Sequence, residues 1–344
     1  MGNLSVGGTG KSPHVEYLLQ LLQPNFMTAV LSRGFGREGR EMTYVENHHT
    51  SKQVGDEPLM MKLKQPASIV AVGIERLHCI PRMLGDVPAI DVIILDDAYQ
   101  HRSVRAGLSI MLTDYSDPFY EDFCLPAGRL RERRKHANRA DIIVVTKCPE
   151  NISDDKKNAF IQHIKPAIHQ HIYFSSISYG LPYPLFPELN SNHSILEQNI
   201  DGYILKTAPP KQIEKCLLVC GIAKPESLIA FLKIQYKEVY TQLYSDHHTF
   251  DDHDIEVIKS AYYDIGKDTT DIITTEKDAV RLLPYANWFL QNKIQLIVQD
   301  IRVKMLDTKH GNFNDDILRY VHHDLKKYKP ERYLEQEKKN SRLM

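Results

Sequence analysis

A glycine-rich loop directly before an amphipathic helix constrains this chain more than any other feature of its sequence. Residues 5–12 read SVGGTGKS, and residues 12–22 carry apolar side chains at the spacing of one helix face. Glycines let backbone N–H groups approach an anion closely, and the N-terminus of a helix adds partial positive charge. The loop therefore predicts a phosphate-binding site formed by Ser5, Val6, Gly7, Gly8, Thr9, Gly10, Lys11 and Ser12.

The last two residues of this loop have distinct expected roles. Lys11 can reach the β- and γ-phosphates of a nucleotide, and the Ser12 hydroxyl can ligate Mg²⁺. The loop departs from the GxxxxGK[ST] pattern at one position, because Ser5 stands where the first glycine is usual. A glycine-rich turn that only caps a helix is the alternative interpretation.

The segment before the loop is short. Only four residues precede Ser5, although a P-loop normally follows a buried strand. We therefore expect the first strand of the fold to be truncated in this chain, which would leave two neighbouring strand edges unpaired. We expect a version extended upstream by about forty residues, enough for a membrane-length helix and one strand, to be more stable and active.

Short β-branched runs alternate with helical patterns along the chain, as in parallel α/β proteins. The runs are nearly continuous in apolar residues, which is typical of strands covered on both faces. They lie at residues 27–32, 68–72, 91–96, 109–114 and 141–146, and again at 216–220, 271–275 and 295–299. The pattern predicts an α/β fold with a P-loop NTPase-like, mostly parallel sheet with helices on both faces, plus a second, smaller α/β domain.

A stretch rich in proline, tyrosine, asparagine and serine separates the two halves. We expect a P-loop nucleotide-binding domain at residues 1–165, an interdomain connection at 166–212, a second α/β domain at 213–310, and a C-terminal helix with a basic tail at 311–344.

Composition excludes several classes of protein. Lysine and arginine number 43 against 44 aspartates and glutamates, so a net charge of −1 gives no overall attraction to nucleic acid. The longest purely apolar run, residues 216–220, is far shorter than the ~20 residues that cross a bilayer. The five cysteines form no CxxC pair and the histidine and cysteine spacings match no zinc site. These features predict a soluble intracellular protein without a nucleic-acid partner.

Two adjacent aspartates end the apolar run DVIILDDAYQH at residues 91–101. A carboxylate at the end of a strand beside a P-loop is where such proteins hold Mg²⁺ and its water shell. We expect Asp96 to take this role, with Asp97 close by. Capping of the next helix is the alternative for both.

Several further motifs follow in an order that is specific as a set. They are GNLSVGGTGKSP (2–13), LSRGFGR (31–37), VGDEPLM (54–60), DDAYQHR (96–102), LPAGRLRE (125–132), GIAKPESL (221–228), SDHHTF (245–250) and TTEKDAVRL (274–282). With these motifs the chain resembles the tetraacyldisaccharide 4'-kinases, which phosphorylate the lipid A precursor of Gram-negative bacteria. The resemblance covers almost the whole chain, with DDAYQH in place of the common DDGFQH.

The resemblance implies transfer of the γ-phosphoryl group of ATP, with Mg²⁺, to the 4'-hydroxyl of a tetraacyldisaccharide 1-phosphate. It also implies two α/β domains with the active site in the cleft between them. Members of the family usually begin with a membrane-associating helix. The resemblance therefore implies peripheral attachment to the cytoplasmic face of the inner membrane, or a soluble cytoplasmic protein where that helix is absent.

The resemblance also assigns catalytic roles. The aspartate of GDEP, Asp56, is expected to act as the base, oriented by a histidine of the DHH element, His247, with His248 as second choice. Lys11, Asp97 and Arg33 are the other expected catalytic residues. The alternative for Asp56 is an N-cap before residues 57–63, and for the histidines it is a solvated loop.

Ligand and substrate roles complete the expected site. Glu132 of the LRE element joins Ser12 and Asp96 as a metal ligand. Residues 129–139 carry six basic side chains, which form either a surface for the substrate's 1-phosphate or anionic headgroups, or a solvated helix face. Lys277 and Asp278 of TEKDA are expected near the active site without a stated role. The expected substrate-binding residues are Arg33, Arg37, Gln100, His101 and Arg131.

Two other functions compete with a kinase. The run VVTKCP (144–149) is similar to the guanine-reading NKxD motif of GTPases, but Pro149 stands where the aspartate is needed. A P-loop ATPase that drives assembly is the second alternative. Such a protein has no evident need for the DDxxQH, PAGxLRE and DHH motifs together, and the oligomeric state stays open.

Overall fold

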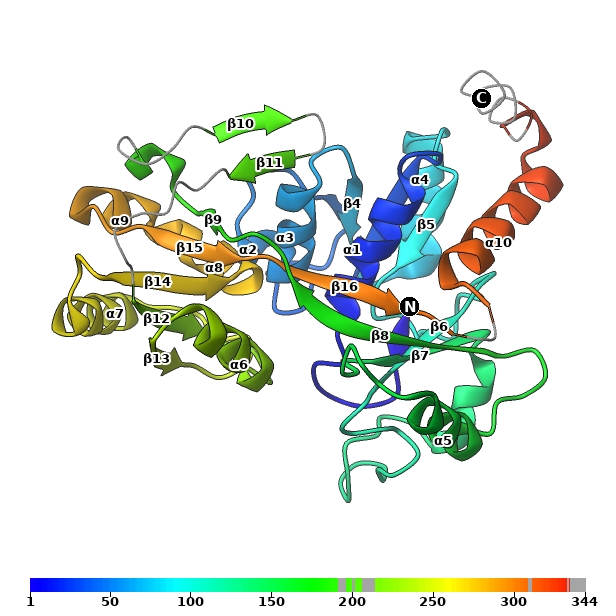
Figure 1. Cartoon of the computed structure of the whole chain (residues 1–344). Helices are drawn as coiled ribbons and strands as arrows, with labels where there is room; N and C mark the ends of the chain where they lie inside the picture. The colour runs from blue at the N-terminus through cyan, green and yellow to red at the C-terminus, as the bar shows by residue number, and fades with distance from the viewer. Residues whose placement is uncertain (191–195, 200–201, 206–213, 309–310, 333, 335–344) are drawn as a thin grey trace. The chain divides into compact units, whose positions relative to one another are not determined.

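The computed structural model describes residues 1–190, 196–199, 202–205, 214–308, 311–332 and 334, drawn in colour in Figure 1. The chain divides into two compact units. Unit 1 comprises Met1–Ser178 and Arg302–Met344, and unit 2 comprises Tyr179–Ile301. Within the described residues, no helix is both long enough and apolar enough to cross a bilayer.

The first sheet of unit 1 carries the glycine-rich loop. Its strand order is β1-β6-β7-β8-β16, and β1, β6, β7 and β8 pair in parallel. The strands are β1 (Gly2–Asn3), β6 (Ile110–Asp114), β7 (Ile142–Thr146), β8 (His171–Tyr179) and β16 (Ile301–Leu306). Every residue of β6 and β7 is buried, as expected where both faces of a parallel sheet are covered.

The second sheet of unit 1 has the order β3-β4-β2-β5, with β2 parallel to both β4 and β5. Its strands are β2 (Thr28–Ser32), β3 (Thr43–Tyr44), β4 (Ile69–Val72) and β5 (Val92–Leu95). Strand β1 is two residues long, and the Met1 amino group donates to Leu95 O at the end of β5 at 2.7 Å. The start of the loop is therefore tied to β5 as well as to β6.

Seven helices of unit 1 lie within the described residues. They are α1 (Lys11–Leu22), α2 (Ser51–Val54), α3 (Asp56–Lys64), α4 (Arg76–Asp86), α5 (Asp154–Ile164), α10 (Phe313–Tyr328) and the 3₁₀ helix η1 (Arg134–Arg139). Helix α1 buries Val15, Leu18, Leu19 and Leu22. These are the positions that helical periodicity predicts, so burial of this face holds the helix that begins at the loop.

Unit 2 has one five-stranded sheet of order β13-β12-β14-β15-β9, in which only β9 is antiparallel to its neighbour. The strands are β9 (Tyr183–Pro184), β12 (Lys215–Cys220), β13 (Glu238–Leu243), β14 (Thr270–Thr275) and β15 (Leu296–Gln299), and a separate hairpin pairs β10 (Leu196–Asn199) with β11 (Gly202–Leu205). The helices are α6 (Glu226–Gln235), α7 (Asp252–Ile265), α8 (Glu276–Leu282), α9 (Ala286–Asn292), η2 (Pro187–Asn190) and η3 (Leu283–Tyr285).

The strands expected from apolar runs are present within a residue or two of their predicted bounds. The compact units differ from the expected domains at both boundaries, because β8 and β16 belong to the sheet of unit 1. The expected connection at 166–212 therefore contains β8, β9, η2, β10 and β11, and its other residues lie partly outside the described part of the chain. Strands β8, β13 and β16 escaped prediction because serine, threonine and charged side chains interrupt their apolar pattern.

Candidate active site

The glycine-rich loop joins β1 to α1, and two of its glycines have left-handed backbone conformations. Gly7 has φ 108° and Gly10, which precedes the helix, has φ 83°. Residues other than glycine rarely adopt these φ angles, so the conformation of the loop depends on the two glycines. Thr9 is held from both sides, since Asn3 Nδ2 donates to its hydroxyl and Thr146 Oγ1 donates to its carbonyl, each at 2.9 Å.

Two residues expected to bind substrate hold the end of β1. Gln100 Nε2 donates to Asn3 O at 2.8 Å, and the Arg131 guanidinium donates to the Asn3 side chain. The backbone of the LPAGRLRE segment runs beside the loop, because Val6 N–H donates to Arg129 O and Arg131 N–H to Leu4 O, both at 2.7 Å. Gln100 and Arg131 therefore support the loop, and their contact with substrate stays a prediction.

Lys11, Asp97 and Arg131 form a charged group beside the loop. Lys11 Nζ lies 3.7 Å from Asp97 Oδ1, and Arg131 NH2 lies 3.1 Å from the same oxygen. Burial by itself would raise the pKa of Asp97, but the charges of Lys11 and Arg131 outweigh it and lower the pKa. Asp97 has φ 43°, and this uncommon conformation places its carboxylate between the two cations.

Asp96, two per cent exposed, points its carboxylate into the protein. Its Oδ2 accepts a hydrogen bond from Ser32 Oγ at 2.9 Å, while Oδ1 has no hydrogen-bond partner among the described residues. Burial, followed by the charges of Glu57 and Asp97, raises the pKa of Asp96. A buried carboxylate oxygen without a partner among the described residues suits a divalent cation.

The other two expected metal ligands differ in their surroundings. Ser12 lies in the first turn of α1, directly after Lys11. Glu132 Oε2 lies 2.7 Å from His136 Nδ1 and 2.7 Å from Arg139 NH2, so it takes part in ion pairing, and its role as a metal ligand stays a prediction. No cluster of three protein ligands is assembled in the part of the chain that the structure describes. Phosphate and water oxygens would therefore have to complete a magnesium shell here.

Asp56 is the first residue of α3 and is seven per cent exposed. The N-cap position belongs to Gly55, and Asp56 Oδ1 accepts a hydrogen bond from Glu57 N–H at 3.0 Å. The N-cap alternative for Asp56 is therefore wrong, because the helix begins one residue earlier than that alternative requires. A Cβ atom at Gly55 would lie 3.1 Å from Gly34 Cα, so the GDEP and SRGFGR segments pack backbone against backbone.

Positive charge gathers near the end of β4. Arg76 is two per cent exposed and donates to Asp96 O at 3.4 Å. Burial, followed by the charge of Arg76 and then that of Arg33, lowers the pKa of His101. Arg33 and His101 were expected to bind substrate, whereas sequence reasoning missed Arg76. It follows a buried strand closely, the same signal that identified Asp96.

Two other basic residues of the sequence analysis have local partners. Arg37 NH2 donates to Glu41 O at 2.7 Å, within its own loop, and its contact with substrate stays a prediction. Lys147 of the VVTKCP run donates to Gly8 O of the glycine-rich loop and lies 3.0 Å from Asp114 Oδ2. This lysine therefore links the loop to β6.

His14, on the first turn of α1, is almost fully buried. Its Nδ1 lies 2.6 Å from Gly10 O and its Nε2 lies 2.8 Å from Ser175 Oγ. Burial, as the largest cause, lowers the pKa of His14 to about 4 from an ordinary value of 6.5. The unfolded chain therefore binds a proton between about pH 6.5 and pH 4 that the folded chain excludes.

We expect this histidine to make folding less favourable as the pH falls through that range. The contribution of His14 to the free energy of unfolding is fully present above pH 6.5 and decreases by about 3 kcal/mol by pH 4. His14→Gln removes the titration, so the difference in unfolding free energy between the two proteins should change by about this amount between pH 7 and pH 4. Urea unfolding over this pH series measures it, and a constant difference would contradict the prediction.

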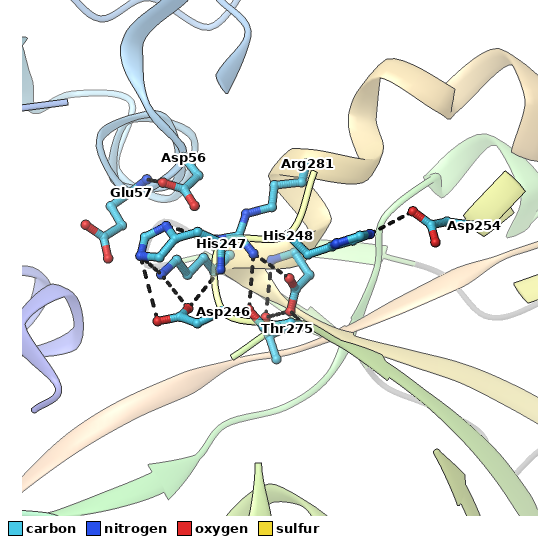
Figure 2. Close-up of polar contacts among 11 residues, drawn as sticks. Asp56, Glu57, Asp246, His247, His248, Asp254, Thr275 and Arg281 are labelled. Carbon is cyan, nitrogen blue, oxygen red and sulfur yellow. Dashed lines mark hydrogen bonds and ion pairs between the residues drawn. The ribbon is translucent and has the colours of Figure 1, made fainter. Parts of the chain in front are cut away.

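Unit 2 contains the histidine pair, shown in Figure 2. His247 has φ 60° and lies 3.1 Å from Lys277 Nζ through its Nε2. His248 Nε2 lies 2.7 Å from Asp254 Oδ2, and its ring stacks on Tyr244 with centroids 4.6 Å apart. His248 is thus held by a carboxylate and an aromatic ring, and the choice of His247 as the functional histidine stays a prediction.

Comparison with known proteins gives consistent results. The chain matches the family model described as Tetraacyldisaccharide-1-P 4'-kinase over residues 1–321. It is 40% identical over 322 residues to the tetraacyldisaccharide 4'-kinase of Bacteroides thetaiotaomicron, covering 93% of this chain and 83% of that protein. It is 38% identical over 326 residues to the enzyme of that name from Flavobacterium johnsoniae, covering 94% and 87%.

A solved structure is also similar to this fold. The crystal structure of LpxK from Aquifex aeolicus in complex with ATP matches with a TM-score of 0.63 at 22% identity, covering 93% of this chain and 87% of that one. This likeness confirms the α/β fold class that the sequence predicts.

Proposed function

The chain belongs to the tetraacyldisaccharide 4'-kinase family, and from this premise we propose how its own residues carry out the reaction. It is an ATP-dependent kinase of lipid A biosynthesis, which transfers the γ-phosphoryl group of ATP to the 4'-hydroxyl of a tetraacyldisaccharide 1-phosphate. The observation that supports this assignment of roles is the charged group at the loop. Lys11 and Arg131 lie on Asp97, and Asp96 has an oxygen with no hydrogen-bond partner among the described residues.

The loop residues Ser5 to Ser12 bind the ATP phosphates. The backbone N–H groups of the loop and the start of α1 supply donors and partial positive charge, and Lys11 neutralises charge on the β- and γ-phosphates. Asp96 Oδ1 and the Ser12 hydroxyl would hold Mg²⁺, which would supply positive charge to screen the phosphates. Asp97 keeps Lys11 and Arg131 in place beside the phosphates.

Asp56 accepts the proton of the 4'-hydroxyl, and His247 orients its carboxylate. Support for Asp56 comes from its buried position at the start of α3, against the arginine-containing loop of residues 31–37. Arg33 and Arg76 provide positive charge for phosphate oxygens of the reactants, and His101, whose pKa is lowered, offers a neutral ring N–H as a donor. Because the acceptor is acylated, we place the reaction at the cytoplasmic face of the inner membrane, with the protein attached peripherally.

The decisive experiment is transfer from γ-labelled ATP to tetraacyldisaccharide 1-phosphate in detergent micelles. We expect a bisphosphorylated product with the label at the 4' position, identified by mass spectrometry. Chelation of divalent cations should abolish transfer, and added Mg²⁺ should restore it. Nucleotide hydrolysis that is indifferent to the acylated acceptor would favour the assembly ATPase instead.

Nucleotide preference provides a separate prediction. The position that reads the guanine edge in NKxD proteins is Pro149 here, and Lys147 is engaged with Gly8 O and Asp114. A proline side chain cannot accept hydrogen bonds from guanine, so we expect ATP to bind more tightly than GTP. Competition binding at equal Mg²⁺ measures the ratio, and a clear preference for GTP would reverse the interpretation.

A further inference from the structure

The TEKDA element of residues 275–279, together with Arg281, surrounds His247 in unit 2. Lys277 Nζ lies 3.1 Å from His247 Nε2, and Arg281 NH2 lies 3.4 Å from His247 Nδ1. Each nitrogen of the imidazole therefore faces a cationic donor, as the dashed lines of Figure 2 mark. We propose that Lys277 is a positioning residue that sets the ring orientation and tautomer of His247, with Arg281 as the competing donor at the other ring nitrogen.

The Arg281 guanidinium is held in place by a buried carboxylate. Its NH1 lies 2.8 Å from Asp278 Oδ1, and Asp278 is fully buried. Asp278 Oδ2 also accepts hydrogen bonds from Thr275 Oγ1 at 2.7 Å and from Gly221 N–H at 3.0 Å. A buried carboxylate with this many donors holds the guanidinium in one place.

The backbone that carries the two histidines, residues 245–250, packs closely against Gly221, which Asp278 and Arg281 also contact. A Cβ atom at Gly221 would lie 2.8 Å from Ser245 O and 3.4 Å from His248 Cβ, so only glycine allows this approach. Arg281 NH1 also donates to Gly221 O at 3.2 Å. The GIAKPESL, SDHHTF and TEKDA motifs, which are far apart in the sequence, thus meet around one histidine.

Lys277 fixes the ring from the other side. Its Nζ lies 3.2 Å from Asp246 Oδ1, and the backbone N–H of His247 donates to the same oxygen at 3.1 Å. A neutral imidazole has one acceptor nitrogen, so only one of the two cations can donate to it at a time. The shorter contact is the one from Lys277, which assigns the lone pair to Nε2 and the proton to Nδ1.

Lys277→Met provides the test, because methionine keeps much of the side-chain length and removes the donor. We expect the His247 tautomer to shift toward Nε2–H, since Arg281 then faces the remaining acceptor nitrogen and Asp246 Oδ2 lies 3.8 Å from Nε2. The ¹⁵N chemical shifts of the two ring nitrogens report this directly and need no turnover. Unchanged ¹⁵N shifts would overturn the inference.

The kinetic part of the test rests on the proposed function of His247. We expect Lys277→Met to lower kcat about 10- to 100-fold while KM for ATP stays unchanged, because a misaligned group slows only the chemical step. Lys277→Arg should recover much of the loss. Lys237→Met is the matched control, since Lys237 forms a surface ion pair with Glu214 in the same unit.

The double variant separates the two hypotheses. In a His247→Ala background, Lys277→Met should add little further loss, because its effect passes through the ring. If His247→Ala is slow but Lys277→Met is as fast as the wild type, the inference fails and the function of His247 stands. If His247→Ala itself turns over normally, the proposed function of this histidine fails along with the inference. Thermal unfolding of each variant excludes misfolding as the cause of a loss.

Discussion

Lys11→Ala should reduce phosphoryl transfer by about 10²- to 10³-fold or more. The ammonium group lies at the start of α1, where it adds to the partial positive charge of the helix and can neutralise charge that builds on the β- and γ-phosphates. Removing a preorganised charge from the site of developing negative charge raises the barrier by several kcal/mol. Initial rates with γ-labelled ATP measure the effect.

The loss should be one of catalysis and not of folding. The Lys11–Asp97 pair is partly exposed, so breaking it should cost about 1 kcal/mol of unfolding free energy or less. Lys304→Ala is a suitable control, because Lys304 forms an exposed ion pair with Glu150 at 2.8 Å. Retention of more than about a tenth of the wild-type turnover, when such groups contribute orders of magnitude, would exclude the proposed role of Lys11.

Asp56→Asn should lower kcat about 10²- to 10⁴-fold, the usual contribution of a general base. Asparagine keeps a carbonyl oxygen that can accept the Glu57 N–H hydrogen bond made now by Asp56 Oδ1, so the start of α3 should be preserved. Only the ability to accept a proton is lost. A variant with normal turnover would show that Asp56 serves the helix and not the chemistry.

His247→Ala should produce a loss of its own, and the Asp56→Asn, His247→Ala double variant tests whether the two act as a unit. If His247 works by orienting Asp56, the double variant should lose little more than the slower single variant. Steady-state kcat values at saturating substrate give the comparison. Losses that multiply would mean that the two residues have independent roles.

Sequence reasoning succeeded where the signal is local. The strands Thr28–Ser32, Ile110–Asp114 and Ile142–Thr146 are nearly continuous apolar runs, because each is covered on both faces. The α1 helix shows its buried face as a periodicity. The strand Glu238–Leu243 escaped because it lies at the edge of its sheet and four of its six residues are exposed. An edge strand needs fewer apolar residues, so its pattern is weak.

The residues of the candidate site also fall into those that local sequence identifies and those that it does not. The glycine-rich loop and the two aspartates that follow Leu95 could be recognised from sequence, since a backbone conformation or a strand end requires those residue types. The choice between His247 and His248 could not, because adjacent histidines have the same local pattern. Only the tertiary structure shows that their surroundings differ, because Asp254 and Tyr244 pack against His248.

The sequence by itself therefore determined the family, the α/β class and the location of the phosphate loop, all of which depend on motifs read along the chain. Only the tertiary structure decided that Gln100 and Arg131 brace Asn3, and that Asp96 keeps one buried oxygen without a partner among the described residues. These contacts join segments about a hundred residues apart. Hydrogen bonding and burial depend on distance in space. They therefore cannot be predicted from the order of residues along the chain.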